Sequence, residues 1–119
     1  MRFLSIYKTR ERELPPSQEE MLKMGKLIEE GIRAGFLLGV EGCMPSAAGA
    51  RVRIDNGGVT VTDGPFTESK EVVGGFALLK FNSKEEAVAY AGQFLQVMGE
   101  GECEVRQLYD PPTSSPPGT

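Results

Sequence analysis

The sequence predicts an α+β domain in which two helices lie on one face of an antiparallel sheet. Two capping-box motifs, Ser17-Gln18-Glu19-Glu20 and Ser83-Lys84-Glu85-Glu86, each open a segment with apolar residues at helical spacing. Other segments alternate between apolar and polar residues as strands do, and an Asn-Gly turn marks a hairpin. The order is strand, helix, hairpin, strand, helix and strand, which is typical of such a domain.

The N-terminal part of the chain supplies a strand and a helix. Residues 2–8 alternate, with Phe3 and Tyr7 on one face of the expected strand. The helix follows its N-cap Ser17 and ends at Gly35, because glycine accepts the left-handed conformation that commonly follows a helix.

The middle of the chain contains the hairpin. Residues 36–40 are expected to form a short extended piece, and residues 41–49 an irregular loop rich in small residues. Residues 51–54 and 59–62 then alternate around Asn56-Gly57, which is the strongest two-residue turn signal. A turn centred there places one set of apolar side chains on a single face, namely Val52, Ile54, Val59 and Val61.

The C-terminal part supplies a strand, a helix and a last strand. Residues 74–81 are almost continuously apolar, which indicates a strand covered on both faces. The second helix ends at Gly99, and residues 102–109 form the last strand. The folded domain is expected to span residues 1–110. Residues 111–119 are rich in Pro and Ser and have the composition of a mobile tail.

These elements predict a ferredoxin-like sandwich with one sheet face that the helices leave open. Two helices cover only one face, whereas the apolar strand at residues 74–81 indicates that both faces are covered. A second copy of the same sheet is the simplest cover. We therefore predict a homodimer packed sheet to sheet, which is a dimeric α+β barrel.

The composition excludes several classes of function. The chain has 119 residues, which suggests one domain, and a net charge of −4, so it lacks the basic surface that binds nucleic acid directly. Its apolar runs fall short of the roughly 20 residues of a membrane helix. The apolar stretch at the N-terminus is too short for a signal peptide, so we expect a cytoplasmic protein.

The chain contains no histidine and two cysteines. Histidine-dependent nucleophile pairs and histidine metal ligands are therefore excluded, and acid–base chemistry would need carboxylates, Lys, Tyr or Cys. Cys43 and Cys103 lie far apart in sequence, so we interpret them as small buried thiols rather than a disulfide or a zinc site. The spacing of the carboxylates matches no calcium loop, and neither a metal nor a cofactor is predicted.

The strongest candidate site is the turn after the hairpin, Asp63-Gly64-Pro65-Phe66. Because side chains alternate along a strand, Asp63 shares a face with Val59 and Val61 if the strand reaches it. A carboxylate at the end of an apolar face is partly desolvated, which would make Asp63 a usable acid or base near neutral pH. The alternative is structural, since Asp before Gly often accepts hydrogen bonds within its own turn.

Neighbouring side chains complete the candidate site. Arg51 is suited to an anionic group, and Tyr7 to donating its hydroxyl into a cleft. The charged loop after the turn either lines the mouth of that cleft or is an ordinary solvated surface. The candidate binding residues are Tyr7, Arg51, Pro65, Phe66, Glu68 and Lys70.

The turn and its flanks resemble the signature of the YCII-related family, specifically its DGPF-domain branch. The resemblance rests on Asp63-Gly64-Pro65-Phe66, on residues 67–71 and on Gly74-Gly75-Phe76. Three further segments resemble the flanks seen in that family, namely residues 36–39, 44–47 and 59–62. The similarity extends over about residues 1–110.

This resemblance implies a ferredoxin-like α+β fold and a dimer, in agreement with the patterning. Family members have been proposed as enzymes because some hold a His–Asp pair in a polar cleft at the dimer interface. Only the aspartate carries over, at Asp63, since this chain has no histidine. Some DGPF-domain proteins are associated with extracytoplasmic-function sigma factors, which implies a link to transcription through protein contacts.

Several functions therefore stay open. In the first, the protein binds or transforms a small molecule in a cleft at the sheet and dimer interface, with Asp63 as acid or base. In the second, it is a non-catalytic sensor or interaction module, linked to sigma-factor-dependent transcription. In the third, the turn is purely structural and caps the dimer.

Overall fold

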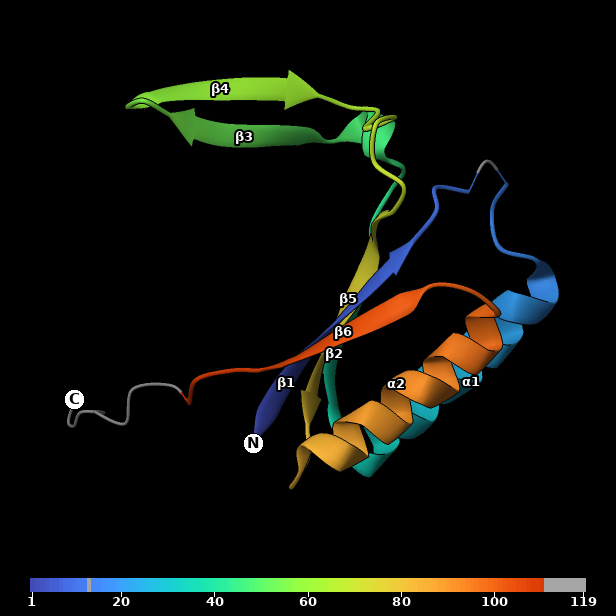
Figure 1. The fold of residues 1–119 in the computed structure, drawn as a ribbon. Coiled ribbons are helices and arrows are strands. Elements are labelled where there is room, and N and C mark those ends of the chain that lie inside the picture. Colours follow the sequence, from blue (N-terminus) through green and yellow to red (C-terminus); the bar gives the residue numbers. More distant parts are fainter. Residues whose placement is uncertain (13, 111–119) are drawn as a thin grey trace.

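The computed structural model describes residues 1–12 and 14–110 and shows an α+β domain with a four-stranded antiparallel sheet. In chain order the elements are β1 (Arg2–Thr9), α1 (Gln18–Ala34), β2 (Leu37–Gly42), the 3₁₀ turn η1 (Ser46–Ala48), β3 (Ala50–Asp55), β4 (Gly58–Asp63), β5 (Val72–Lys80), α2 (Lys84–Met98) and β6 (Glu102–Gln107). The sheet order is β2-β5-β1-β6, and both helices lie on one face of it (Figure 1). The predicted α+β class is confirmed, and the order is compatible with a ferredoxin-like sandwich. The predicted tail at 111–119 lies outside the described residues.

Both helices begin and end at the residues that the sequence predicts. The side-chain oxygen of Ser17 accepts the backbone N–H of Glu20 at 3.1 Å, and the corresponding bond to Ser83 is 3.3 Å. Such caps typically stabilise a helix by about 1 kcal/mol. Gly35 and Gly99 end the helices with φ angles of 87° and 79°, in the left-handed region. Neither of these described helices is long and apolar enough to cross a membrane.

The hairpin β3–β4 stands apart from the main sheet. It forms a two-stranded sheet of its own and projects to the side that the helices leave open (Figure 1). Its predicted register is confirmed, since Ile54 pairs with Val59 and Val52 with Val61. The hairpin strands were expected to belong to the antiparallel sheet, and that expectation is wrong. The edge position beside β5 is taken by β2, the segment predicted only as a short extended piece.

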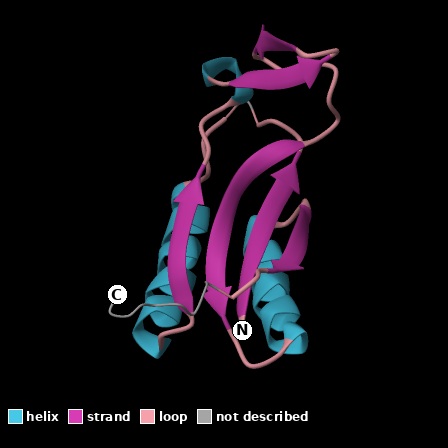
Figure 2. Cartoon of the chain, turned by 90° about the vertical axis from the view of Figure 1, so that its left-hand side faces the viewer, coloured by secondary structure: helices cyan, strands magenta, loops and turns pink. Residues whose placement is uncertain are grey.

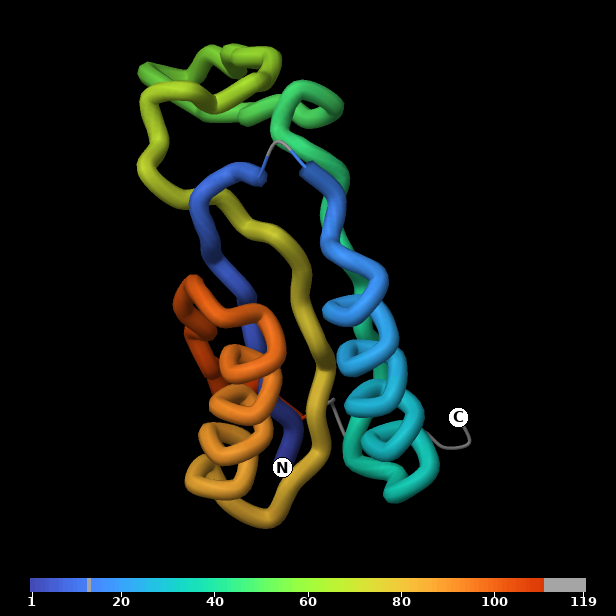
Figure 3. The backbone as a smooth tube through the Cα atoms, turned by 90° about the vertical axis from the view of Figure 1, so that its right-hand side faces the viewer, coloured from blue at the N-terminus to red at the C-terminus, as the bar shows by residue number. Residues whose placement is uncertain are grey.

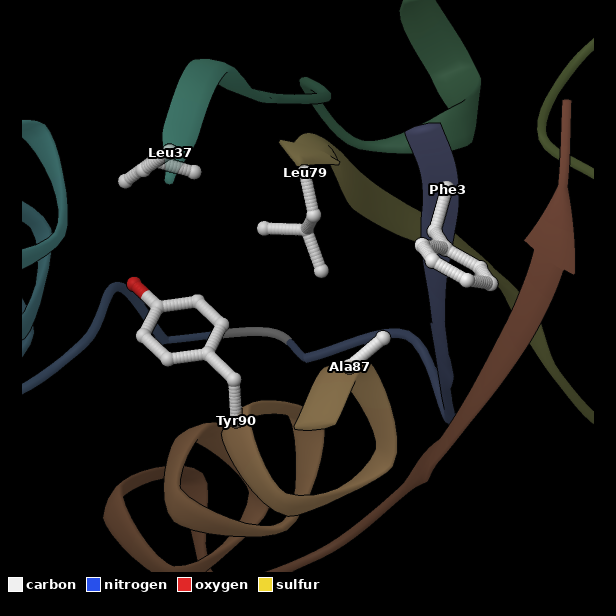
Figure 4. Close-up of a cluster of buried hydrophobic side chains, with 5 residues drawn as sticks. All are labelled: Phe3, Leu37, Leu79, Ala87 and Tyr90. Carbon is white, nitrogen blue, oxygen red and sulfur yellow. The ribbon is translucent and has the colours of Figure 1, made fainter. Parts of the chain in front are cut away.

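The hydrophobic core lies at the end of the helix–sheet layer nearest the N-terminus. Phe3 and Leu79 are neighbours on β1 and β5 and are the largest fully buried side chains in the described part of the chain. Leu37, Ala87 and Tyr90 pack with them from β2 and α2 (Figure 4). The other end of the same layer is less completely filled.

The second face of the sheet carries apolar side chains and no described helix. Figure 2 shows this face toward the viewer, with both helices behind it. Leu4 and Ile6 of β1 lie beside Leu78 and Phe76 of β5, and Phe76 is 43% exposed. We call these four residues the open sheet face. The helices of the same chain therefore cover one face of β5. The sequence predicts that its other face is covered too, and this would require a second molecule.

Candidate functional site

The Asp63-Gly64-Pro65-Phe66 turn packs directly on η1. The backbone N–H of Gly64 donates to the carbonyl of Gly49 at 2.9 Å, and the N–H of Phe66 donates to the hydroxyl of Ser46 at 2.9 Å. A Cβ atom at Gly64 would lie 1.7 Å from the carbonyl oxygen of Ser46. Glycine is therefore required here because the two backbones touch. The turn is a tightly held part of the structure.

Glu11 holds the same loop from the other side. Its carboxylate accepts hydrogen bonds from the backbone N–H and from the hydroxyl of Ser46, the latter at 2.8 Å. The backbone bond and then the hydroxyl bond hold the pKa of Glu11 below its ordinary value. Ser46 is buried, so one side chain links the loop after β1, η1 and the turn. Sequence reasoning missed both residues, because Glu11 and Ser46 are far apart in the chain and carry no local motif.

Acid is expected to loosen this loop. Because the pKa of Glu11 is lower in the folded than in the unfolded state, its stabilising contribution is complete above its ordinary pKa of 4.5. The contribution is then lost as the pH falls through the lowered folded-state value. Amide hydrogen exchange of Phe66, corrected for intrinsic rates, should show protection at about pH 7 that decreases toward about pH 3. Glu11→Gln should show weak protection at both pH values, and wild-type protection in that variant would contradict the expectation.

Arg51 joins β3 to the loop after the turn. Its guanidinium carbon lies 4.0 Å from the centre of the Phe66 ring, and it donates to the carboxylate of Glu68 and to the hydroxyl of Ser69, the latter at 2.7 Å. The pKa of Glu68 is lowered, first by a backbone hydrogen bond and then by Arg51. Three predicted residues, Arg51, Phe66 and Glu68, are thus brought into one cluster.

A cleft of about 710 Å³ lies beside this cluster. Residues from β1, the loop after β2, β3, the turn and β5 line it, among them Lys8, Cys43, Met44, Arg51, Phe66, Glu71 and Val73. We call this space the loop cleft. Lys8 forms an ion pair of 2.7 Å with Glu104, and this carboxylate raises the pKa of Lys8. The cleft therefore combines an apolar wall with the cationic groups of Lys8 and Arg51 and with the carboxylate of Glu71.

Asp63 lies at the end of β4, paired with Ala50. As predicted, it shares a hairpin face with Val59 and Val61, which puts it on the face opposite Arg51. Val59 and Val61 are 66% and 63% exposed, and Asp63 is exposed as well. A single chain therefore does not supply the desolvation predicted for this carboxylate. That desolvation would require another surface to cover the hairpin.

The remaining predicted residues are spread more widely. Tyr7 is buried on the helix side of the sheet, where its hydroxyl donates to the backbone carbonyl of Glu100 at 2.8 Å. The structure therefore does not bring Tyr7 to the turn. Pro65 and Lys70 are exposed, in the turn and in the loop that follows it.

The two cysteines are free thiols at different places. Cys43 is exposed at the loop cleft, so the expectation of a buried thiol is wrong for it. Cys103 is half-buried on the side of the sheet that the helices cover, and burial raises the pKa of its thiol. In residues 1–12 and 14–110, no group of three acidic or cysteine side chains is placed to hold a metal ion.

Comparison with known families matches residues 1–110 to the YCII-related domain. The chain belongs to the YCII-related family. This YCII-related chain is also similar to an uncharacterised protein of Rhizobium meliloti (strain 1021), with 37% identity over 78 residues. The match covers 65% of this chain and 63% of that protein, so the chain spans less than two thirds of its relative. The predicted family is thereby confirmed.

Proposed function

We propose that this YCII-related protein works as a homodimer that binds a small molecule at its dimer interface, in the loop cleft. The observation that carries the proposal is the apolar hairpin face, formed by Val52, Ile54, Val59 and Val61. These side chains are between 63% and 73% exposed. An isolated two-stranded hairpin is marginally stable in water, and an apolar patch of this kind typically marks an interaction surface.

A second copy of the chain is the partner that fits this surface. The hairpin projects to the same side as the open sheet face (Figure 1). Two copies packed through these faces would cover both apolar surfaces at once, as in the predicted dimeric α+β barrel. The loop cleft lies at the base of the hairpin, because β3 and the turn contribute part of its wall. Pairing would therefore enclose the cleft further.

The groups around the loop cleft favour a ligand with an apolar body and one carboxylate. Met44, Val73 and Phe66 supply apolar surface, Lys8 and Arg51 supply positive charge, and Glu71 supplies one negative charge. A guanidinium has five N–H donors, and the bonds of Arg51 to Glu68 and Ser69 occupy only part of them. The remaining donors are suited to a carboxylate.

Asp63 is the acid or base in this proposal, and it can reach the ligand only in the dimer, because in a single chain it lies on the hairpin face opposite Arg51 and does not line the loop cleft. A second copy that covers the hairpin face would remove water from the Asp63 carboxylate, which is exposed in the single chain. Desolvation of this kind is what fits a carboxylate for proton transfer near neutral pH. The role depends on the dimer, because the chain itself leaves this side chain in water.

A non-catalytic sensor or interaction module is the second candidate function. Both cationic groups near the cleft already form ion pairs, Lys8 with Glu104 and Arg51 with Glu68. This candidate is favoured by those pairs, because a cation that is neutralised within the chain is less available to a substrate. The predicted link to a sigma factor and to the DGPF branch belongs to this candidate. Under it, Asp63→Asn leaves the binding of a protein partner unchanged.

Benzoate is expected to bind in the loop cleft and to protect Cys43 from alkylation. The test uses Cys103→Ala, in which Cys43 is the single thiol, and follows its reaction with iodoacetamide by mass spectrometry. Saturating benzoate should slow the reaction by about fivefold or more, whereas benzyl alcohol, which lacks the charge, should not. Arg51→Gln should weaken the binding of benzoate by roughly tenfold, which corresponds to about 1.4 kcal/mol of binding free energy.

Arg53→Gln is the matched control for this experiment. Arg53 is on the same strand and the same hairpin face, but it does not line the loop cleft. Hydrogen exchange at Phe66 checks that the loop stays folded in Arg51→Gln. Equal benzoate affinities of the two variants, or no protection of Cys43 at all, would remove the proposed ligand site.

A further inference from the structure

We propose a second ligand site, between the helices and the sheet, that takes a small neutral aromatic molecule of about two fused rings. A cavity of about 250 Å³ lies there, separate from the loop cleft. Its wall comes from both helices and from all four strands of the main sheet, and includes Tyr7, Met24, Ile28, Phe94, Met98 and Cys103. We call it the helix–sheet cavity. Figure 3 shows α1 and α2 on either side, with β5 running between them.

The burial of the helices shows that the chain does not fill this space. At the core end of α2, Ala87 and Tyr90 are buried. At its other end, Phe94 and Met98 face the cavity and are only half-buried, and the same is true of Met24 on α1. Protein interiors are close-packed, and the cost of a void increases with its volume. A cavity of this size is therefore more favourable when a ligand occupies it.

The wall of the helix–sheet cavity selects against charged ligands. The two tyrosine hydroxyls in its wall already have partners, since that of Tyr7 donates to the carbonyl of Glu100 at 2.8 Å and that of Tyr90 to the carbonyl of Leu27 at 3.3 Å. The charged side chain in the wall is that of Glu41, which is exposed to solvent and would repel an anion. A charged or strongly polar ligand would lose its hydration without gaining hydrogen bonds. The neutral, apolar class of molecule is therefore the one that fits.

The shape of the wall favours an aromatic ligand. The rings of Tyr7 and Phe94 meet edge to face with their centres 5.0 Å apart, which is a geometry that extends readily to another ring. Met24 and Met98 are flexible and adapt to the outline of a ligand. An apolar protein cavity of about 150 Å³ binds benzene. A volume of about 250 Å³ leaves room for a second fused ring.

Indole is the probe for this site, and Cys103 is its reporter. In the full-length Cys43→Ser variant, Cys103 is the single thiol and lies in the cavity wall. Saturating indole should slow its alkylation by iodoacetamide by about fivefold or more. Because burial raises the pKa of this thiol, the reaction is best followed at about pH 9. Benzoate should not protect Cys103, and indole should not protect Cys43 in the Cys103→Ala variant.

Filling the cavity should abolish the binding of indole. Ala91→Leu adds the larger volume, from α2, and Ile28→Phe is a smaller addition that places an aromatic ring from α1 in case the first variant misfolds. Calorimetric titration of either folded variant should show at least a tenfold loss of indole affinity relative to wild type. Arg51→Gln, which alters only the loop cleft, should leave indole affinity within twofold of wild type.

Three results would overturn the second site. If indole leaves the rate of Cys103 alkylation unchanged and the filled variants have a higher Tm than wild type, the cavity is a packing defect and not a ligand site. Protection of Cys43 alone would place indole in the loop cleft and leave the proposed function standing. Wild-type indole affinity in both filled variants would place the bound molecule elsewhere.

Discussion

Replacing Ile54 with aspartate is expected to make the protein monomeric at micromolar concentration. Ile54 is 73% exposed within the apolar hairpin face, and it would be buried between two copies in the proposed dimer. Burying an isoleucine contributes about 1.5–3 kcal/mol, and a carboxylate without a partner in its place adds a desolvation cost. The dimer dissociation constant should therefore rise by roughly 100-fold or more. Light scattering over a range of concentrations measures this directly.

Thr60→Asp is the matched control for this prediction. Thr60 lies on the same hairpin but on the opposite face, paired with Arg53, so a carboxylate there stays in water. This variant should keep the mass of the wild-type dimer. Circular dichroism should be unchanged in both variants, because neither residue touches the core. A dimeric Ile54→Asp protein would show that the hairpin is not the interface, and a monomeric wild type would remove the dimer altogether.

Gly64→Ala is expected to detach the turn from η1 and to lower the free energy of unfolding by roughly 3 kcal/mol. The added Cβ would lie 1.7 Å from the carbonyl oxygen of Ser46 and 2.6 Å from its carbonyl carbon. Both neighbours are backbone atoms, so the turn would have to move, and overpacking of this kind costs about 1–3 kcal/mol or more. The movement would also break the hydrogen bond from the Phe66 N–H to Ser46. Denaturant unfolding measures the change.

Gly25→Ala is a control for which the expected change in stability has the opposite sign. Gly25 lies inside α1, and a Cβ atom there would meet nothing within 4 Å. Alanine in a helix interior is more favourable than glycine by about 1 kcal/mol, so this variant should be slightly more stable than wild type. If Gly64→Ala instead matched Gly25→Ala in stability, the close contact between the turn and η1 would not exist in solution.

Local signals account for the parts of the fold that the sequence predicted. The helix ends depend on Ser17 and Gly35, which act within one turn of their own helix. The hairpin register depends on Asn56 and Gly57, whose φ angles of 49° and 82° are those of a tight hairpin turn. Each of these features is decided by residues close together in the chain.

The arrangement of the sheet was harder to predict because it depends on distant pairings. The edge strand β2 contains Gly39 and Gly42, which weaken its strand pattern, and it is held by pairing with β5. The hairpin carries the stronger strand signals, yet it makes its own small sheet. Strand propensity alone therefore identified strands without identifying the sheet that each one joins.

In the candidate site, too, the features that depend on local geometry were predicted, and those that depend on distant packing were not. Alternation along β4 predicted correctly that Asp63 shares a face with Val61, since this needs only local geometry. Alternation along β1 placed Phe3 and Tyr7 on one face, but it could not tell which face the helices cover. The helices cover the face with Tyr7, so its hydroxyl lies away from the turn.

The strand order also determines when the sheet can be completed during synthesis. The first strand, β1, lies inside the sheet between β5 and β6, which are made late. The backbone N–H of Leu108 donates to the carbonyl of Arg2 at 2.9 Å, so the two ends of the described chain meet. The two hairpin strands are close together in sequence and can pair early. Both edges of β1 stay unpaired until β5 and β6 have been synthesised. The hairpin strands can therefore pair in a nascent chain before the sheet is complete, and the unpaired edges of β1 are where premature association between chains would begin.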